Sequence, residues 1–81
     1  MPEPRKFKLR VMNPEGMLFE GPAESLFAKG DEGEFEMLAF HYPVVSILVA
    51  GNLIIDWKKY IKIKGGLLKF SENDCVVLAE T

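Results

Sequence analysis

The chain has 81 residues, a length that predicts a single domain. Its composition, 48 % hydrophobic and 27 % charged, is ordinary for a soluble globular protein and argues against disorder. The formal net charge of −2 excludes a general attraction to nucleic acid or anionic lipid, although a local basic patch could still act.

The start of the chain and its rare residues give few signals of targeting. Residues 1–6 are charged and contain prolines, lack the apolar core of a secretory signal, and are predicted to be a flexible lead-in. The longest apolar run, residues 43–50, is far too short to span a membrane. The single cysteine, Cys75, cannot form an internal disulfide, which fits a reducing compartment, and its apolar neighbours predict a small buried side chain. We therefore expect a soluble protein whose membrane association comes only through a partner.

Residues 7–81 are predicted to form one β domain that opens with a hairpin. Polar and apolar residues alternate strictly at residues 7–11, which predicts a half-buried strand. The side chains of this strand that face the predicted core are Phe7, Leu9 and Val11. Turn chemistry at residues 13–16 separates this strand from a short second strand at residues 17–20. Glycine and proline at residues 21–22 predict a further break.

The rest of the chain continues as short apolar segments divided by turn residues. Helix and strand both fit residues 23–29, and the flanking glycines favour strand, while residues 44–49 fit a buried strand or a tight connection. Further strands are predicted at residues 53–55, 60–64, 67–70 and 75–78. The predicted breaks between them lie at residues 51–52, 56–59, 65–66 and 71–74, the last interpreted as a four-residue hairpin loop. Since no long amphipathic helix pattern occurs, the predicted fold class is all-β, a flattened β-sandwich or barrel of about ten short strands.

The stretch GDEGEFEMLAFHYP, residues 30–43, concentrates acids, turn residues and apolar anchors. Asp31, Glu32 and Glu34 surround Gly33, which predicts an acidic tip held by the β framework. Their spacing lacks the ligand order of a calcium-binding EF-hand, and no Gly-Lys-Ser/Thr follows to make a phosphate loop. We expect a solvated face or a docking surface for basic or polar groups, with no metal and no cofactor.

Other candidate residues favour structural roles. Glu34 could orient His41 for general-base catalysis, but no nucleophile lies nearby, so a histidine that satisfies a turn is the favoured interpretation. Phe40 and Tyr42 flank that histidine and are expected in the core, or as interface anchors if they are exposed. Met37 and Leu38 are expected in the core. The lysines that predict the wet face of a sheet, without the interleaved aromatics of a nucleic-acid platform, are Lys58, Lys59, Lys62 and Lys64.

The order of these motifs resembles the epsilon subunit of F-type ATP synthases. Residues 13–21, NPEGMLFEG, resemble the "tPeg-lfeG" opening of that family, and residues 33–38 with His41 and Pro43 resemble its "GEfgiLpgHaP". The later matches, to "kpG", "sGG" and "vtvLad", lie at Gly51, at Gly65 and Gly66, and at residues 77–79. Together the matches keep the order and approximate spacing of the family from Lys8 to Glu80.

The resemblance implies a non-catalytic rotor subunit built as a ten-stranded flattened β-sandwich. In this family the domain lies at the foot of the central stalk, between the gamma subunit and the membrane ring of c subunits, on the cytoplasmic face of the bacterial inner membrane. It helps to couple proton transport to ATP synthesis. The residues predicted to dock on the c-ring are Asp31, Glu32, Gly33, Glu34 and His41, which the resemblance places at that end, and Phe40, which departs from the family pattern and is expected to add apolar contact.

The sequence also departs from the family pattern. Glu36 replaces the usual glycine, and Ala39 and Phe40 replace the usual Pro-Gly before the histidine. Full-length members continue into a pair of C-terminal helices, which carry regulatory inhibition and, in some bacteria, ATP binding. This chain ends at Thr81, so neither role is assigned to it, and both a natural short form and an excised domain stay open.

Two alternatives to the rotor subunit have their own structural consequences. A free-standing β-sandwich that binds sugar or peptide through Phe40, Tyr42 and Trp57 predicts a concave pocket lined by these aromatics. A small enzyme that uses Glu34 and His41 predicts a cleft with a third polar partner.

Overall fold

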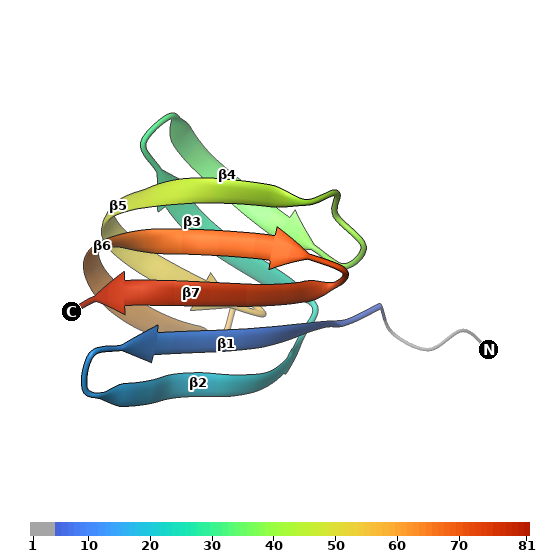
Figure 1. The fold of residues 1–81 in the computed structure, drawn as a ribbon, viewed down its shortest axis with the longest axis horizontal. Coiled ribbons are helices and arrows are strands. Elements are labelled where there is room, and N and C mark those ends of the chain that lie inside the picture. Colours follow the sequence, from blue (N-terminus) through green and yellow to red (C-terminus); the bar gives the residue numbers. More distant parts are fainter. Residues whose placement is uncertain (1–4) are drawn as a thin grey trace.

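A computed structural model describes residues 5–81, and all the regular structure among them is β-strand (Figure 1). The strands are β1 (Phe7–Asn13), β2 (Gly16–Ala23), β3 (Ser25–Gly30), β4 (Gly33–Leu38), β5 (Val44–Ile55), β6 (Lys59–Ser71) and β7 (Asp74–Glu80). The predicted all-β class is confirmed. The expected flexible lead-in falls mainly on residues 1–4, which lie outside the described residues. Within residues 5–81 no helix is long and apolar enough to cross a membrane.

The seven strands form one sheet in the order β2-β1-β7-β6-β5-β3-β4. Neighbours pair antiparallel, except that β1 and β7 are parallel. The long strands β5 and β6 bend, so the sheet folds over itself into a front layer with β2, β1 and β7 and a rear layer with β3 and β4 (Figure 1). The second half of β6 pairs with β7 in the front layer, and the second half of β5 pairs with β3 in the rear layer. Since β5 and β6 also pair with each other along their length, both strands belong to both layers.

The strand count is seven rather than about ten in part because two expected breaks, at residues 51–52 and 65–66, lie inside β5 and β6 and join expected strands. The break expected at residues 21–22 lies inside β2, and the boundary between β2 and β3 falls at Glu24 instead. The β5–β6 ladder pairs Val49 with Gly65 and Gly51 with Ile63, so backbone pairing continues on both sides of the bend. Glycine lets a strand turn sharply without ending its hydrogen-bonded ladder.

The turns are tighter than the sequence suggests. Ser71 pairs with Asp74, so the predicted four-residue loop is a two-residue turn whose central residues, Glu72 and Asn73, have φ of 53° and 60°. Two consecutive positive φ angles are typical of the type I′ turn, which matches the twist of a hairpin. The predicted reversal at residues 56–59 is confirmed as the β5–β6 turn.

One hydrophobic core lies between the two layers. It contains the expected residues of the first strand, since Phe7, Leu9 and Val11 are all buried, and the Phe7 ring packs edge-on against Phe70 at a centroid distance of 5.5 Å. Cys75 is also buried, as predicted. The prediction that Leu38 is buried is wrong, because its side chain is 51 % exposed. Consecutive strand residues point to opposite faces, so when Met37 enters the core its neighbour must leave it.

Candidate docking surfaces

The acidic stretch forms the tip of the β3–β4 hairpin. Gly30 pairs with Gly33, so Asp31 and Glu32 make a two-residue turn, and Glu34 follows at the start of β4. All four residues from Asp31 to Glu34 are exposed. The backbone N–H of Asp31 donates to the carbonyl oxygen of Ile47 at 3.0 Å, which ties the tip to β5. The tip is therefore an anchored projection.

Glycine is required at both ends of this turn. Gly33 has φ of +128°, a conformation that a residue with a side chain rarely adopts. A Cβ at Gly30 would lie 3.1 Å from Cε1 of Phe35 and 3.3 Å from the carbonyl oxygen of Gly33. The three carboxylates of Asp31, Glu32 and Glu34 thus point outward from a constrained backbone, an arrangement suited to docking on basic or polar groups.

Phe40 and His41, the other two predicted docking residues, lie beyond the opposite end of β4. The six residues of β4 separate them from the tip by roughly 20 Å at the usual rise per residue. Phe40 is 63 % exposed and donates its backbone N–H to Oδ1 of Asn73 at 2.7 Å. The predicted docking residues thus form two separate groups.

His41 occupies a structural corner. Its Nδ1 lies 2.7 Å from the carbonyl oxygen of Tyr42, its ring stacks on the Tyr42 ring at 4.2 Å, and it meets the edge of Phe70 at 5.9 Å. The favoured interpretation of a histidine that satisfies a turn is confirmed. Because Glu34 lies at the far end of β4, the structure does not bring together the pair that the enzyme hypothesis needs. Among residues 5–81 no group of three or more potential metal ligands is close enough to hold an ion.

The three aromatics of the ligand-binding hypothesis do not share a pocket. Trp57 packs on Phe27 at a centroid distance of 5.4 Å and donates its indole N–H to Oε2 of Glu36 at 2.9 Å. Tyr42 lines a separate hollow of about 190 Å³ that neither Phe40 nor Trp57 borders. The aromatics are exposed, but they lie on two different turns.

Sequence reasoning missed an apolar row across the outer side of the front layer. The register pairs Ile47 with Leu67, Leu67 with Leu78, and Leu78 with Met12, while Met17 lies opposite Met12 at the next strand. Four of these side chains are between 41 % and 56 % exposed. In the sequence, the available signal was that apolar residues occupy strand positions that face outward, where a solvated sheet face would carry polar residues. The order of the strands in the sheet is needed to show that these residues form one row.

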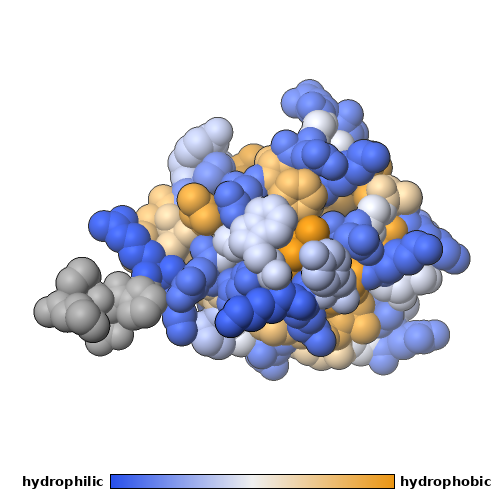
Figure 2. Space-filling view, turned by 180° about the vertical axis from the view of Figure 1, so that it is seen from behind, coloured by the Kyte–Doolittle hydropathy of each residue, from blue (hydrophilic) through white to orange (hydrophobic). Residues whose placement is uncertain are grey.

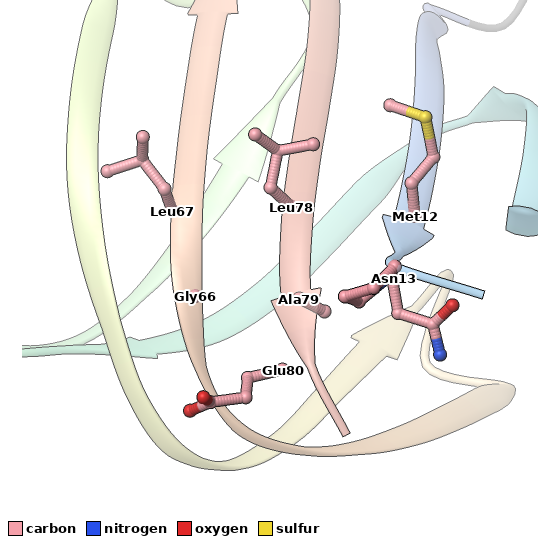
Figure 3. Close-up of a pocket in the computed structure, with 8 residues that line it drawn as sticks. Met12, Asn13, Gly66, Leu67, Leu78, Ala79 and Glu80 are labelled. Atoms are coloured by element: carbon pink, nitrogen blue, oxygen red, sulfur yellow. The ribbon is translucent and has the colours of Figure 1, made fainter. Parts of the chain in front are cut away.

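A hollow of about 570 Å³ adjoins this row (Figure 3). Leu67 and Leu78 project side by side on its border, with Met12 on the neighbouring strand, and Gly66 contributes no side chain. A Cβ at Gly66 would lie 2.5 Å from the carbonyl oxygen of Leu78, so β6 and β7 approach closely beside the hollow. Its apolar border suits a protruding apolar side chain of another protein.

Comparison with known proteins gives one consistent result. The profile of the family "ATP synthase, Delta/Epsilon chain, beta-sandwich domain" matches residues 6–81. Two similar curated relatives, both named ATP synthase epsilon chain, are from Nitratiruptor sp. and Sulfurimonas denitrificans, and each is 36 % identical over 90 % and 93 % of this chain, respectively. The chain spans only 60 % and 61 % of their lengths.

Solved structures share the fold. A chain from the central stalk and c-ring structure of the Tetrahymena thermophila mitochondrial ATP synthase matches with a TM-score of 0.78 and 14 % identity, over 99 % of this chain and 67 % of that one. A chain from the Euglena gracilis mitochondrial ATP synthase matches with a TM-score of 0.83 and 20 % identity, over 100 % of this chain and 54 % of that one.

Proposed function

Because this chain belongs to the family of the ATP synthase delta/epsilon chain β-sandwich domain, we propose that it is a non-catalytic rotor subunit of a proton-translocating ATP synthase. In this role it links the gamma subunit to the c-ring, at the cytoplasmic face of the bacterial inner membrane, and helps to couple proton transport to ATP synthesis. The observation that carries the proposal is the family match over residues 6–81, together with an anchored acidic tip.

The tip is the proposed contact with the c-ring. Asp31, Glu32, Gly33 and Glu34 project from the end of the β3–β4 hairpin and place three carboxylates on a constrained turn. Carboxylates on such a projection steer and orient association with basic or polar loops. Phe40 and His41 are proposed as a second contact with the same complex, since they lie at the other end of β4.

The apolar row is the proposed contact with the gamma subunit. A contiguous apolar surface on a small domain is typical of a protein interface, and the hollow beside Leu67 and Leu78 offers a place for an anchoring side chain. The tip adjoins one end of the row, because the backbone N–H of Asp31 donates to the carbonyl oxygen of Ile47, and the row continues away from the tip through Leu67 and Leu78. The two proposed contacts are therefore neighbours on the surface of the domain.

Charge reversal at the tip tests the c-ring contact. The double variant Asp31→Lys, Glu34→Lys is expected to reduce co-purification with the membrane sector, while the circular dichroism spectrum of the isolated domain stays unchanged. The matched control reverses two exposed acids away from the tip, Glu15→Lys and Glu24→Lys, and should assemble normally. Normal assembly of the tip variant would exclude the proposed contact.

The gamma contact is tested separately. Leu78→Gln, on the apolar row, is expected to weaken co-purification with gamma. Tyr60→Gln, at a similarly exposed position on the rear layer, should not weaken it. Equal effects of the two variants would mean that the row is not the gamma interface.

A further inference from the structure

The outer side of the rear layer carries a second apolar group. The register aligns Glu36 with Phe27, Phe27 with Ile54, and Ile54 with Tyr60, so one row crosses four strands. Trp57 packs over Phe27. Figure 2 shows this face with apolar and weakly polar side chains in its middle and hydrophilic ones around them. The domain thus exposes apolar surface on both outer sides.

Charge is divided between the two edges of this rear face. Glu34 and Glu36 lie on β4, at one edge, and Lys62 and Lys64 lie on β6, at the other; all four are exposed. Glu34 is opposite Lys29 on β3, and Lys62 is opposite Asn52 on β5. Glu34 and Lys62 each lie two residues along their strand from a member of the row that contains Phe27 and Ile54, on the same side of that row and at opposite edges of the face.

From this arrangement we propose that the rear face binds a second copy of this chain in an isologous dimer. A two-fold axis that lies in the interface, parallel to the strands and between β3 and β5, exchanges the two edges of the face. It places Glu34 of each copy opposite Lys62 of the other, and the Trp57 ring that packs over Phe27 in each copy against Ile54 of the other. A face that carries opposite charges on either side of an apolar centre is complementary to itself under this rotation.

The dimer is a state of the unassembled subunit, and it is independent of the proposed role in ATP synthase. It covers the rear apolar group, and it engages Glu34, which belongs to the tip. Exposed apolar patches otherwise promote nonspecific association, so a specific weak dimer protects the free chain until it meets its larger partners.

A charge-swap experiment tests this geometry. The mass of the purified chain is measured by light scattering after size-exclusion chromatography from micromolar to millimolar concentration. It is expected to rise with concentration from 9.1 kDa towards twice that value. Glu34→Lys and Lys62→Glu should each weaken the dimer by about tenfold, since each change creates two like-charge contacts across the axis. The double swap Glu34→Lys, Lys62→Glu should restore it.

Three outcomes would overturn the proposal. The first is a wild-type chain that is monomeric at every concentration. The second is a double swap that fails to restore a dimer lost in both single variants, which would exclude the Glu34–Lys62 pairing. The third is a dimer that is insensitive to both single changes but is lost in Leu78→Gln, which would assign self-association to the front layer. All three substituted positions are exposed, so the variants should fold, and circular dichroism checks this.

Discussion

Asn73 joins three segments that are distant in the sequence. Its Oδ1 accepts the backbone N–H of Phe40 at 2.7 Å, its Nδ2 donates to the carbonyl oxygen of Lys6 at 2.8 Å, and its own carbonyl oxygen accepts the N–H of Lys8 at 3.1 Å. It does so at a φ of 60°, which asparagine tolerates better than most residues. One turn side chain therefore fixes the start of β1 and the turn after β4.

Asn73→Ala is expected to lower the free energy of unfolding by about 2–3 kcal/mol, from two lost side-chain hydrogen bonds and a left-handed alanine. Asn73→Gly separates the two causes, since it keeps the backbone conformation and should cost only about 1–2 kcal/mol. Urea denaturation measures both values. A larger loss for glycine than for alanine would show that this account of the turn is wrong.

Cys75 is a thiol buried in the core. Burial in the core, and secondarily the carboxylate of Asp74, raise the pKa of the Cys75 thiol to about 12. Since only the thiolate is a good nucleophile, Cys75 in the folded protein should react with iodoacetamide no faster than the rate at which unfolding exposes its side chain. Alkylation followed by mass spectrometry, with and without urea, measures this. Rapid labelling of the native chain would contradict the observed burial.

The same pKa predicts how stability depends on pH. The thiol of the unfolded chain has the ordinary pKa of 9.0, whereas the folded thiol keeps its proton up to a pKa of about 12. Between these values the unfolded state binds fewer protons, so the free energy of unfolding should fall as pH rises. Cys75→Ala should show a shallower fall over this window, measured by urea titrations at several pH values. Equal slopes in both proteins would refute the assignment.

At the scale of the strand, the bend of β6 contains two adjacent glycines, Gly65 and Gly66, with different surroundings. At Gly66 a Cβ would meet the carbonyl oxygen of Leu78 at 2.5 Å, a backbone atom that cannot move without displacing β7. At Gly65 the nearest atom would be the carbonyl oxygen of Leu48, at an ordinary 3.5 Å. The close approach of β6 and β7 at this position therefore requires glycine at residue 66.

Gly66→Ala is expected to destabilise the domain by about 1–3 kcal/mol, the usual cost of overpacking, because β6 and β7 must separate. Gly65→Ala is the matched control and should change stability by less than about 1 kcal/mol. Thermal melts followed by circular dichroism compare the two. If both variants melt alike, the strand approach at residue 66 is not a constraint.

At the scale of the whole molecule, the two layers share one core. Leu9 on β1 and Leu26 on β3 belong to different layers, and both are completely buried in the same cluster. The layers are continuous through β5 and β6, which pair along their whole length. Neither layer can therefore lose its packing without exposing the other, and the domain should unfold in one cooperative step.

Leu9→Ala and Leu26→Ala are each expected to cost about 2–5 kcal/mol and to shift the same single transition. Leu38→Ala, at a half-exposed position, should cost under about 1 kcal/mol and serves as the control. Urea denaturation monitored by circular dichroism and by Trp57 fluorescence tests this. Two separate transitions, or a variant that affects one probe alone, would contradict a single core.

The amino-acid sequence by itself determined the local features of this protein. Alternation at residues 7–11 predicted which side chains are buried, turn residues located the reversals at residues 13–16, 56–59 and 71–74, and the motif order indicated the family. These features are readable because they depend on neighbours within a few residues. The prediction that Leu38 is buried was wrong because it relied on the apolar character of Met37 and Leu38. Strict alternation along β4 would have buried Met37 and exposed Leu38.

Only the tertiary structure decided which distant residues share a surface. The parallel pairing of β1 with β7 places Met12 beside Leu78, and the bend of β5 and β6 separates the front row from the rear group. The length of β4 separates the acidic tip from His41, although the two lie within one short stretch of sequence. The register between strands far apart in the chain is fixed by packing of the whole core, and no local pattern encodes it.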